Sequence, residues 1–147
     1  MFWWPKLEIP KGWHQDKEQS YHYGSKALAP DGYTFANAES VIYARAQYKP
    51  RIPNIKPLDQ FIEDDKKNIL ESSSGIEIKE VNSLATADGT QLRSLSFIPE
   101  NNGNWEHVSY AEEGDFYLIF TLSSRSQRDY EKSIATYESI IRNYKGK

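Results

Sequence analysis

The sequence contains no cysteine among its 147 residues. This excludes disulfide bridges, thiolate nucleophiles, iron–sulfur clusters and cysteine-based zinc sites. Long hydrophobic runs are also missing. The longest purely apolar stretch is Phe116–Phe120, far short of the roughly 20 residues that span a bilayer. We therefore expect no membrane span, and a soluble chain with a water-exposed surface.

Motifs for catalysis or cofactor binding are absent as well. The spacing of the 8 glycines gives no nucleophile elbow, no dinucleotide-binding fingerprint and no phosphate loop. His14, His22 and His107 share no metal-ligand spacing. Acidic residues around Gly114 lack the register of a calcium loop and indicate a charged hairpin turn. The sequence thus predicts no catalytic residue, no metal site and no cofactor.

Aromatic residues are abundant, with 10 Tyr and 4 Trp, and such rings favour half-buried sheet surfaces. Short strands are expected over residues 7–13 and 19–25, the second from the alternation of Tyr21 and Tyr23. The β-forming run Ser40–Ala46 predicts a buried central strand. The strongest pattern follows: residues 76–81, 92–98, 105–111 and 116–122, separated by turn residues, predict a four-stranded antiparallel meander.

Two helices complete the predicted elements. One begins at Leu58, with acidic residues in its first turns. The other runs from about Gln127 to Tyr144, with Ser126 and Asp129 at the spacing of an N-terminal cap. Its apolar stripe must pack on the sheet, and comprises Tyr130, Ile134, Tyr137, Ile141 and Tyr144. The pattern predicts one α+β domain over residues 1–147, an antiparallel sheet flanked by helices.

The segment Tyr48–Pro57 has a composition that favours a surface loop. Three prolines forbid regular structure and hold the chain extended. The loop carries three basic residues, whereas the following stretch, Leu58–Ser124, is predominantly acidic. One interpretation is a solvated connection. The other is a binding site on a rigid loop, formed by Tyr48, Lys49, Arg51 and Lys56.

The order of elements resembles a known group. Pro10-Lys11-Gly12-Trp13 after the first expected strand resembles the P-x-G-W motif of PsbP/DcrB-type proteins. The middle helix, the meander and the long closing helix with a Tyr/Ile stripe resemble the same group. The resemblance implies an α/β/α sandwich, shared with the Ran-binding protein Mog. It further implies a small non-enzymatic accessory, envelope or chaperone protein, often exported or lipid-anchored, and it transfers no functional residue.

Three hypotheses for the function follow. The first is a non-catalytic binding or accessory protein of the bacterial cell envelope. The second is a hydrolase or small-ligand enzyme whose residues converge from separate strands, which would place a histidine and a carboxylate in a deep pocket. The third is a chaperone-type domain that binds a partner protein in an open apolar groove.

Partners and location follow from the same observations. We expect a protein partner, and a monomer or weak dimer. Nucleic acid is not expected, because the net charge is −3 and phosphate binding needs a concentrated basic face. The opening Met1-Phe2-Trp3-Trp4-Pro5 fits either a chain whose export signal has been removed, hence periplasmic or envelope-associated, or an edge strand. A cytoplasmic location stays open.

Overall fold

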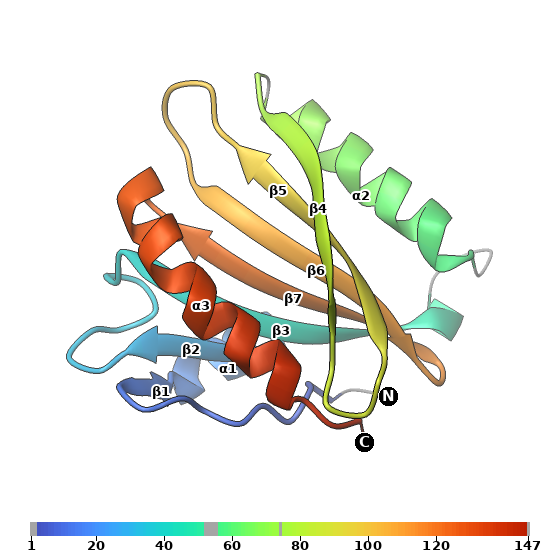
Figure 1. Ribbon diagram of the computed structural model, residues 1–147, viewed down its shortest axis with the longest axis horizontal. Coiled ribbons are helices and arrows are strands. Elements are labelled where there is room, and N and C mark those ends of the chain that lie inside the picture. The colour runs from blue at the N-terminus through green and yellow to red at the C-terminus, as the bar shows by residue number, and fades with distance from the viewer. Residues whose placement is uncertain (1–2, 52–55, 74, 147) are drawn as a thin grey trace.

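Seven β-strands form one antiparallel sheet in the computed structural model, which describes residues 3–51, 56–73 and 75–146 (Figure 1). Their order across the sheet is β1-β2-β3-β7-β6-β5-β4. The strands are β1 (Trp13–Gln15), β2 (Lys26–Pro30), β3 (Ser40–Tyr48), β4 (Glu77–Ala85), β5 (Gln91–Ile98), β6 (Trp105–Glu113) and β7 (Phe116–Ser124).

The four C-terminal strands confirm the predicted meander, since β4, β5, β6 and β7 pair in sequence order. The expected central strand is confirmed as β3, which lies between β2 and β7. It pairs with β7 over its whole length, from Ser40 opposite Ser124 to Tyr48 opposite Phe116. This pairing joins the N-terminal strands to the meander across a long stretch of sequence.

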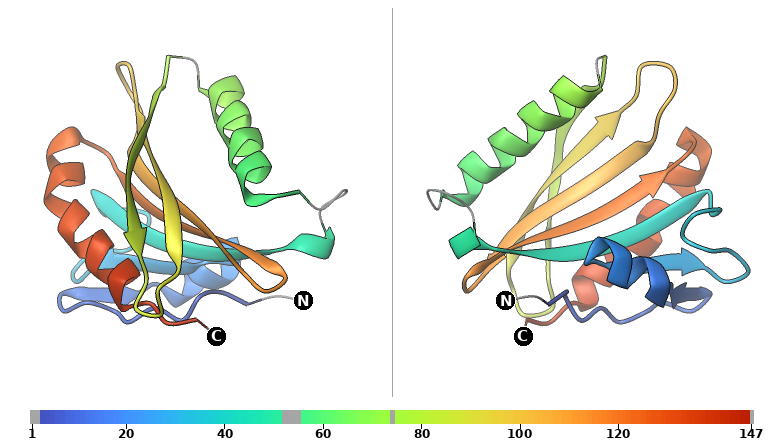
Figure 2. Two further views of the ribbon diagram at one scale, coloured as in Figure 1. Left: turned by 45° about the vertical axis from the view of Figure 1, so that its right-hand side comes forward. Right: turned by 180° about the vertical axis from the view of Figure 1, so that it is seen from behind.

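Two long helices cover opposite faces of the sheet (Figure 2). They are α2 (Leu58–Ser72) and α3 (Gln127–Asn143). Because strand side chains alternate between faces, the core divides in two. One cluster packs with Ile62 of α2, and the other packs with Tyr137, Ile140 and Ile141 of α3. The predicted α+β sandwich is therefore confirmed.

Helix α3 follows its predicted pattern closely. Ser126 caps its start, because the Ser126 hydroxyl oxygen accepts a hydrogen bond of 3.2 Å from the Asp129 amide. Of the expected stripe, Tyr137, Ile141 and Tyr144 are buried. The helix therefore packs on the sheet through the face that the sequence indicated.

The N-terminal region corrects two expectations. The strand expected over residues 19–25 is wrong: a short helix, α1 (Lys17–Tyr23), occupies it. The Asp16 side chain caps the start of this helix, and Gly24 ends it with a positive φ of 65° that favours glycine. The strand expected over residues 7–13 is also wrong, because β1 begins only at Trp13. Figure 2 shows α1 on the same side of the sheet as α2.

Within residues 3–51, 56–73 and 75–146, each helix is too short or too polar to span a lipid bilayer.

Candidate functional site

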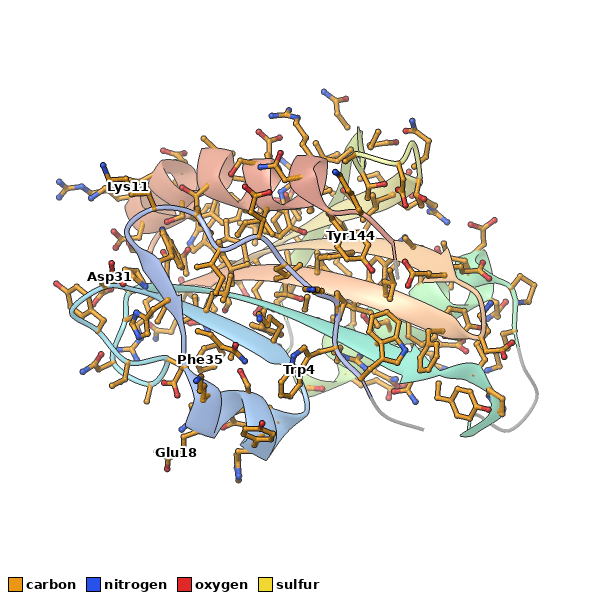
Figure 3. The ribbon with its side chains drawn as sticks, turned by 90° about the horizontal axis from the view of Figure 1, so that it is seen from below. Trp4, Lys11, Glu18, Asp31, Phe35 and Tyr144 are labelled. Atoms are coloured by element: carbon orange, nitrogen blue, oxygen red, sulfur yellow. The ribbon has the colours of Figure 1, made fainter. Side chains whose placement is uncertain are left out.

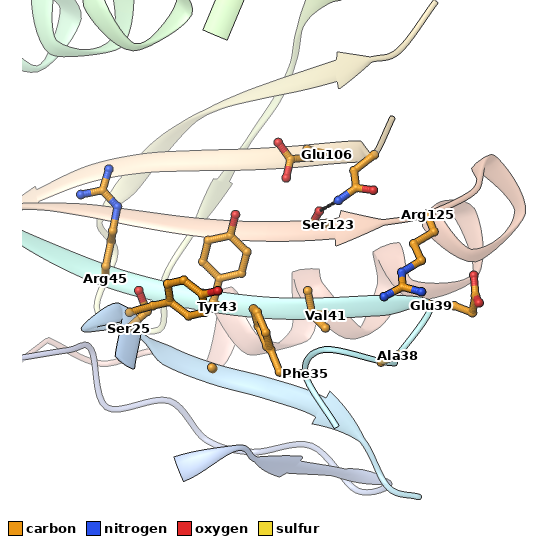
Figure 4. Close-up of a pocket in the computed structure, with 13 residues that line it drawn as sticks. Ser25, Phe35, Ala38, Glu39, Val41, Tyr43, Arg45, Glu106, Ser123 and Arg125 are labelled. Carbon is orange, nitrogen blue, oxygen red and sulfur yellow. Dashed lines mark hydrogen bonds between the residues drawn. The ribbon is translucent and has the colours of Figure 1, made fainter. Parts of the chain in front are cut away.

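A cleft of about 470 Å³ opens on the α2 side of the sheet, next to α1 (Figure 4). Its floor is built by β3, where Val41, Tyr43 and Arg45 occupy alternate positions and therefore point to one face. The intervening Ile42 and Ala44 are buried in the cluster under α3. The residues that line the cleft come from α1, β2, β3, β6, β7 and the loop before β3.

The loop between β2 and β3 forms one wall of the cleft, and hydrogen bonds hold it in place. The Asp16 carboxylate accepts from the Phe35 amide at 3.0 Å, and also caps α1. The Phe35 amide is the main reason that the pKa of Asp16 lies below its usual value. From the other end, Arg125 Nη2 donates to the Ala36 carbonyl at 2.5 Å. The wall is therefore held in place by the fold itself, without a ligand.

Three aromatic rings line this wall of the cleft, from the half-buried Tyr43 to the exposed Tyr23. Phe35 contacts Tyr43 edge-on, with ring centroids 5.8 Å apart, and Tyr23 lies 6.2 Å from Phe35. Figure 3 shows Phe35 beside α1, on the side of the sheet opposite α3. Tyr23 is 62% exposed, whereas Tyr43 is half-buried and burial raises its pKa. The cleft thus offers a flat apolar surface that is partly open to water.

A carboxyl group lies on the β6 side of the cleft. Glu106 is half-buried and lies opposite Ser123 in the β6–β7 pairing. Burial raises the pKa of Glu106, and a hydrogen bond from the Ser123 hydroxyl opposes this rise. Asn104 Nδ2 donates to Ser123 Oγ at 3.0 Å. Three neighbouring polar groups are therefore held together at one wall.

Two arginines stand at opposite ends of the cleft, with Glu106 between them (Figure 4). Arg45 is half-buried, and its Nη1 donates to Gln47 Oε1 at 3.2 Å. Neither Arg45 nor Arg125 forms an ion pair with a carboxylate of the described residues. Both guanidinium groups keep donors for a bound molecule.

The histidines expected in an enzyme site lie elsewhere. His14 is 3.1 Å from Asp31 in an exposed pair, and His22 is exposed on α1. His107 is buried on the α3 side, where its ring lies 5.0 Å from that of Tyr137. None of the three lines the cleft. Among residues 3–51, 56–73 and 75–146, no group of three metal-ligating side chains comes together.

The residues predicted to bind a partner lie away from the cleft. Tyr48 ends β3, with its ring 5.2 Å from that of Phe116. Lys49 Nζ lies 2.5 Å from Glu112 Oε2, and Lys56 Nζ lies 2.5 Å from Asp64 Oδ2. The side chain of Arg51 and residues 52–55 fall outside the described part of the chain. A binding role for this loop stays a prediction.

The sequence pattern does not predict the cleft, although it contains one signal. Arg45 interrupts a run of β-forming residues that predicts a buried strand. An arginine at such a position either reaches solvent at the protein surface or lines a binding site. The sequence does not distinguish these alternatives, because the neighbour of Arg45 in the sheet, Ile119 of β7, is known only from the β3–β7 pairing.

Comparison with known proteins shows the fold alone. No family model matches the sequence, and no curated protein matches it. The structure is similar to the solution structure of cyanobacterial PsbP (CyanoP) from Synechocystis sp. PCC 6803, with a TM-score of 0.56. The match covers 95% of this chain and 84% of that chain at 12% sequence identity. The chain therefore has a PsbP-like fold, as the sequence pattern indicated.

Proposed function

We propose that the protein is a non-catalytic binding protein that binds a small molecule in the cleft next to α1, on the α2 side of the sheet. The observation that carries the proposal is the cleft itself: an aromatic wall and separate polar groups face one space, and the fold holds them in place. Sites for small ligands are typically pre-formed concave spaces of this size, with few convergent polar groups.

The polar groups of the cleft favour binding over catalysis. A serine nucleophile is usually activated by a histidine that a third group orients. The Ser123 hydroxyl instead donates to the Glu106 carboxyl group and accepts from Asn104 Nδ2. Glu106 has its pKa raised by burial, as a general acid would. It lacks the histidine partner that the enzyme hypothesis required, since no histidine lines the cleft.

Nuclear magnetic resonance of the ¹⁵N-labelled chain tests the proposal. A library of small ring compounds in anionic, neutral and cationic versions is added one by one. We expect at least one compound to shift the amide signals of the cleft strands, at Val41–Arg45 and Asn104–Glu106, and to leave those of α3 unchanged. A library that moves no cleft signal would refute the proposed binding function.

An envelope location belongs to the same proposal and rests on the sequence resemblance to exported accessory proteins. Fractionation of the native bacterium, with an antibody against the chain, tests it. Recovery of the protein with cytoplasmic markers only would overturn the location and leave the binding function untouched.

A protein partner at the Tyr48–Pro57 loop is a separate prediction. Replacing Lys49 and Arg51 by glutamate should weaken binding of an acidic partner at low ionic strength, since charge mainly speeds association. Because the Lys49 side chain is only 15% exposed and pairs with Glu112, Lys49→Glu should also lower stability, and thermal unfolding verifies that the variant is folded. Affinity for any partner recovered from the native host is the measurement. The matched control is Arg128→Glu with Lys132→Glu, two exposed cations of α3. Equal affinity of both double variants would make the loop a connection only.

A further inference from the structure

Arg45 is a cation of the cleft without an ion pair among the described residues, and it indicates a class of ligand. This inference rests on the proposed binding function. Arg45 is half-buried and its one hydrogen bond among the described residues goes to a neutral amide, that of Gln47. A desolvated charge is costly unless an opposite charge meets it. The planar guanidinium fits a carboxylate with two parallel hydrogen bonds.

The acidic groups near Arg45 are already engaged. The Asp65 carboxylate of α2 accepts a hydrogen bond from the Tyr110 hydroxyl at 2.5 Å. Glu106 accepts a hydrogen bond from the Ser123 hydroxyl, and burial raises the pKa of Glu106. The carboxyl groups of Asp65 and Glu106 on this side of the sheet would repel an anion with several charges. The charges therefore favour a ligand with a single negative charge.

The walls indicate the body of the ligand. Phe35 and Tyr43 present an edge and a face at 5.8 Å, a geometry that a further flat ring extends by stacking or edge contact. The floor from Val41 to Arg45 spans four residue steps of strand, roughly 13 Å at the usual rise. The space of about 470 Å³ admits one or two rings with a short side chain.

We infer that the cleft binds a small carboxylic acid with a flat ring, its carboxylate on Arg45 and its ring against Tyr43 and Phe35. The same chemistry occurs in a free aryl acid and in the C-terminal residue of a peptide that ends in an aromatic side chain. The wall at Phe35 is held in place by the fold and limits the cleft on that side, which favours the free acid.

Calorimetric titration with phenylacetate and phenylacetamide tests the inference, because the two probes have nearly the same shape and only phenylacetate carries a negative charge. We expect phenylacetate to bind about tenfold more tightly than the amide, as an added charge-assisted pair would give. Arg45→Gln should remove this difference. Arg45→Lys, which keeps the charge and loses the two-pronged geometry, should fall between. Arg128→Gln, an exposed arginine on the other face, should behave as the wild type.

A peptide arm separates the two sources. A tripeptide ending in phenylalanine, with a free or an amidated C-terminus, is titrated under the same conditions. Weaker binding of the free-ended peptide than of phenylacetate supports the small acid, and tighter binding overturns that choice of source. Thermal unfolding of each variant verifies that it is folded, and Phe35→Ala provides a second variant that weakens acid and amide alike.

The failures are distinguishable. Equal affinity for phenylacetate and phenylacetamide, or an unchanged preference in Arg45→Gln, overturns the assigned ligand class. So does absence of phenylacetate binding. In each case the proposed binding function survives if neutral or cationic rings still shift the cleft amides, and it falls if no ring compound does.

Discussion

Replacing Ile141 by alanine is expected to lower the free energy of unfolding by about 2–5 kcal/mol, the cost of a buried large-to-small change that leaves a cavity. Ile141 is 0% exposed and lies in the cluster between α3 and the sheet. The neighbouring Tyr137 hydroxyl makes hydrogen bonds of 2.8 Å with Ser109 Oγ and with the Phe120 carbonyl. These bonds anchor the helix to β6 and β7, so the site cannot easily collapse to fill the space.

Chemical denaturation of matched variants measures this effect. Ile134→Ala removes the same atoms from a half-buried position on the edge of the cluster, and should cost less. Lys132→Ala, at an exposed position of the same helix, should change stability by no more than about 0.5 kcal/mol. Equal midpoints for all three variants would show that the buried face of α3 has been assigned wrongly.

The larger elements were predictable because each has a long pattern of its own. The meander consists of four strands of eight or nine residues that are separated by clear turn residues, and α3 carries both a cap and a stripe. Helix α1 has only 7 residues, which is too short for a helical period to outweigh the alternation of Tyr21 and Tyr23. Its caps, Asp16 and Gly24, were the better signal, because they act through backbone geometry.

Alternation also misleads where both faces of the sheet are covered. Ser94 and Ser96 alternate with apolar residues in β5, a pattern typical of a solvated face. Both are buried under α3, where Ser94 bonds Ser109 and Ser96 bonds the Tyr130 hydroxyl. Ser96 is satisfied by a tyrosine of α3 and Ser94 by a serine of β6. Sequence spacing within one strand does not reveal partners that lie on another element.

The cleft was not predictable for a related reason. Its lining residues extend from Tyr23 to Arg125, and only the pairing of β3 with β7 brings the two ends of the chain together. Arg45 and Glu106 have no common spacing or motif in the sequence. Such a site is defined by topology, and the topology is the part that a local pattern determines least.

The stability of the protein is expected to fall by about 2 kcal/mol between neutral pH and about pH 4.5 because of one buried histidine, His107. His107 is 6% exposed, and neither of its ring nitrogens has a hydrogen-bond partner among the described residues. Burial lowers the pKa of His107 from 6.5 to about 4. The unfolded chain therefore takes up a proton below about pH 6.5, while the folded chain resists until about pH 4. Folding loses stability across this window as the pH falls.

Urea denaturation of the wild type and His107→Leu across this range isolates the effect. Burial raises the pKa of Glu106, so this group binds its proton more readily in the folded chain and opposes the loss at acidic pH. It is present in both proteins and cancels in the difference. Leucine is close to histidine in volume and leaves no unsatisfied nitrogen, so His107→Leu should be as stable as the wild type at neutral pH and more stable near pH 4.5. His22→Gln removes an exposed imidazole and should keep the wild-type slope. A constant difference between wild type and His107→Leu at all pH values would mean that His107 becomes protonated as easily in the fold as outside it, and that its pocket opens to water.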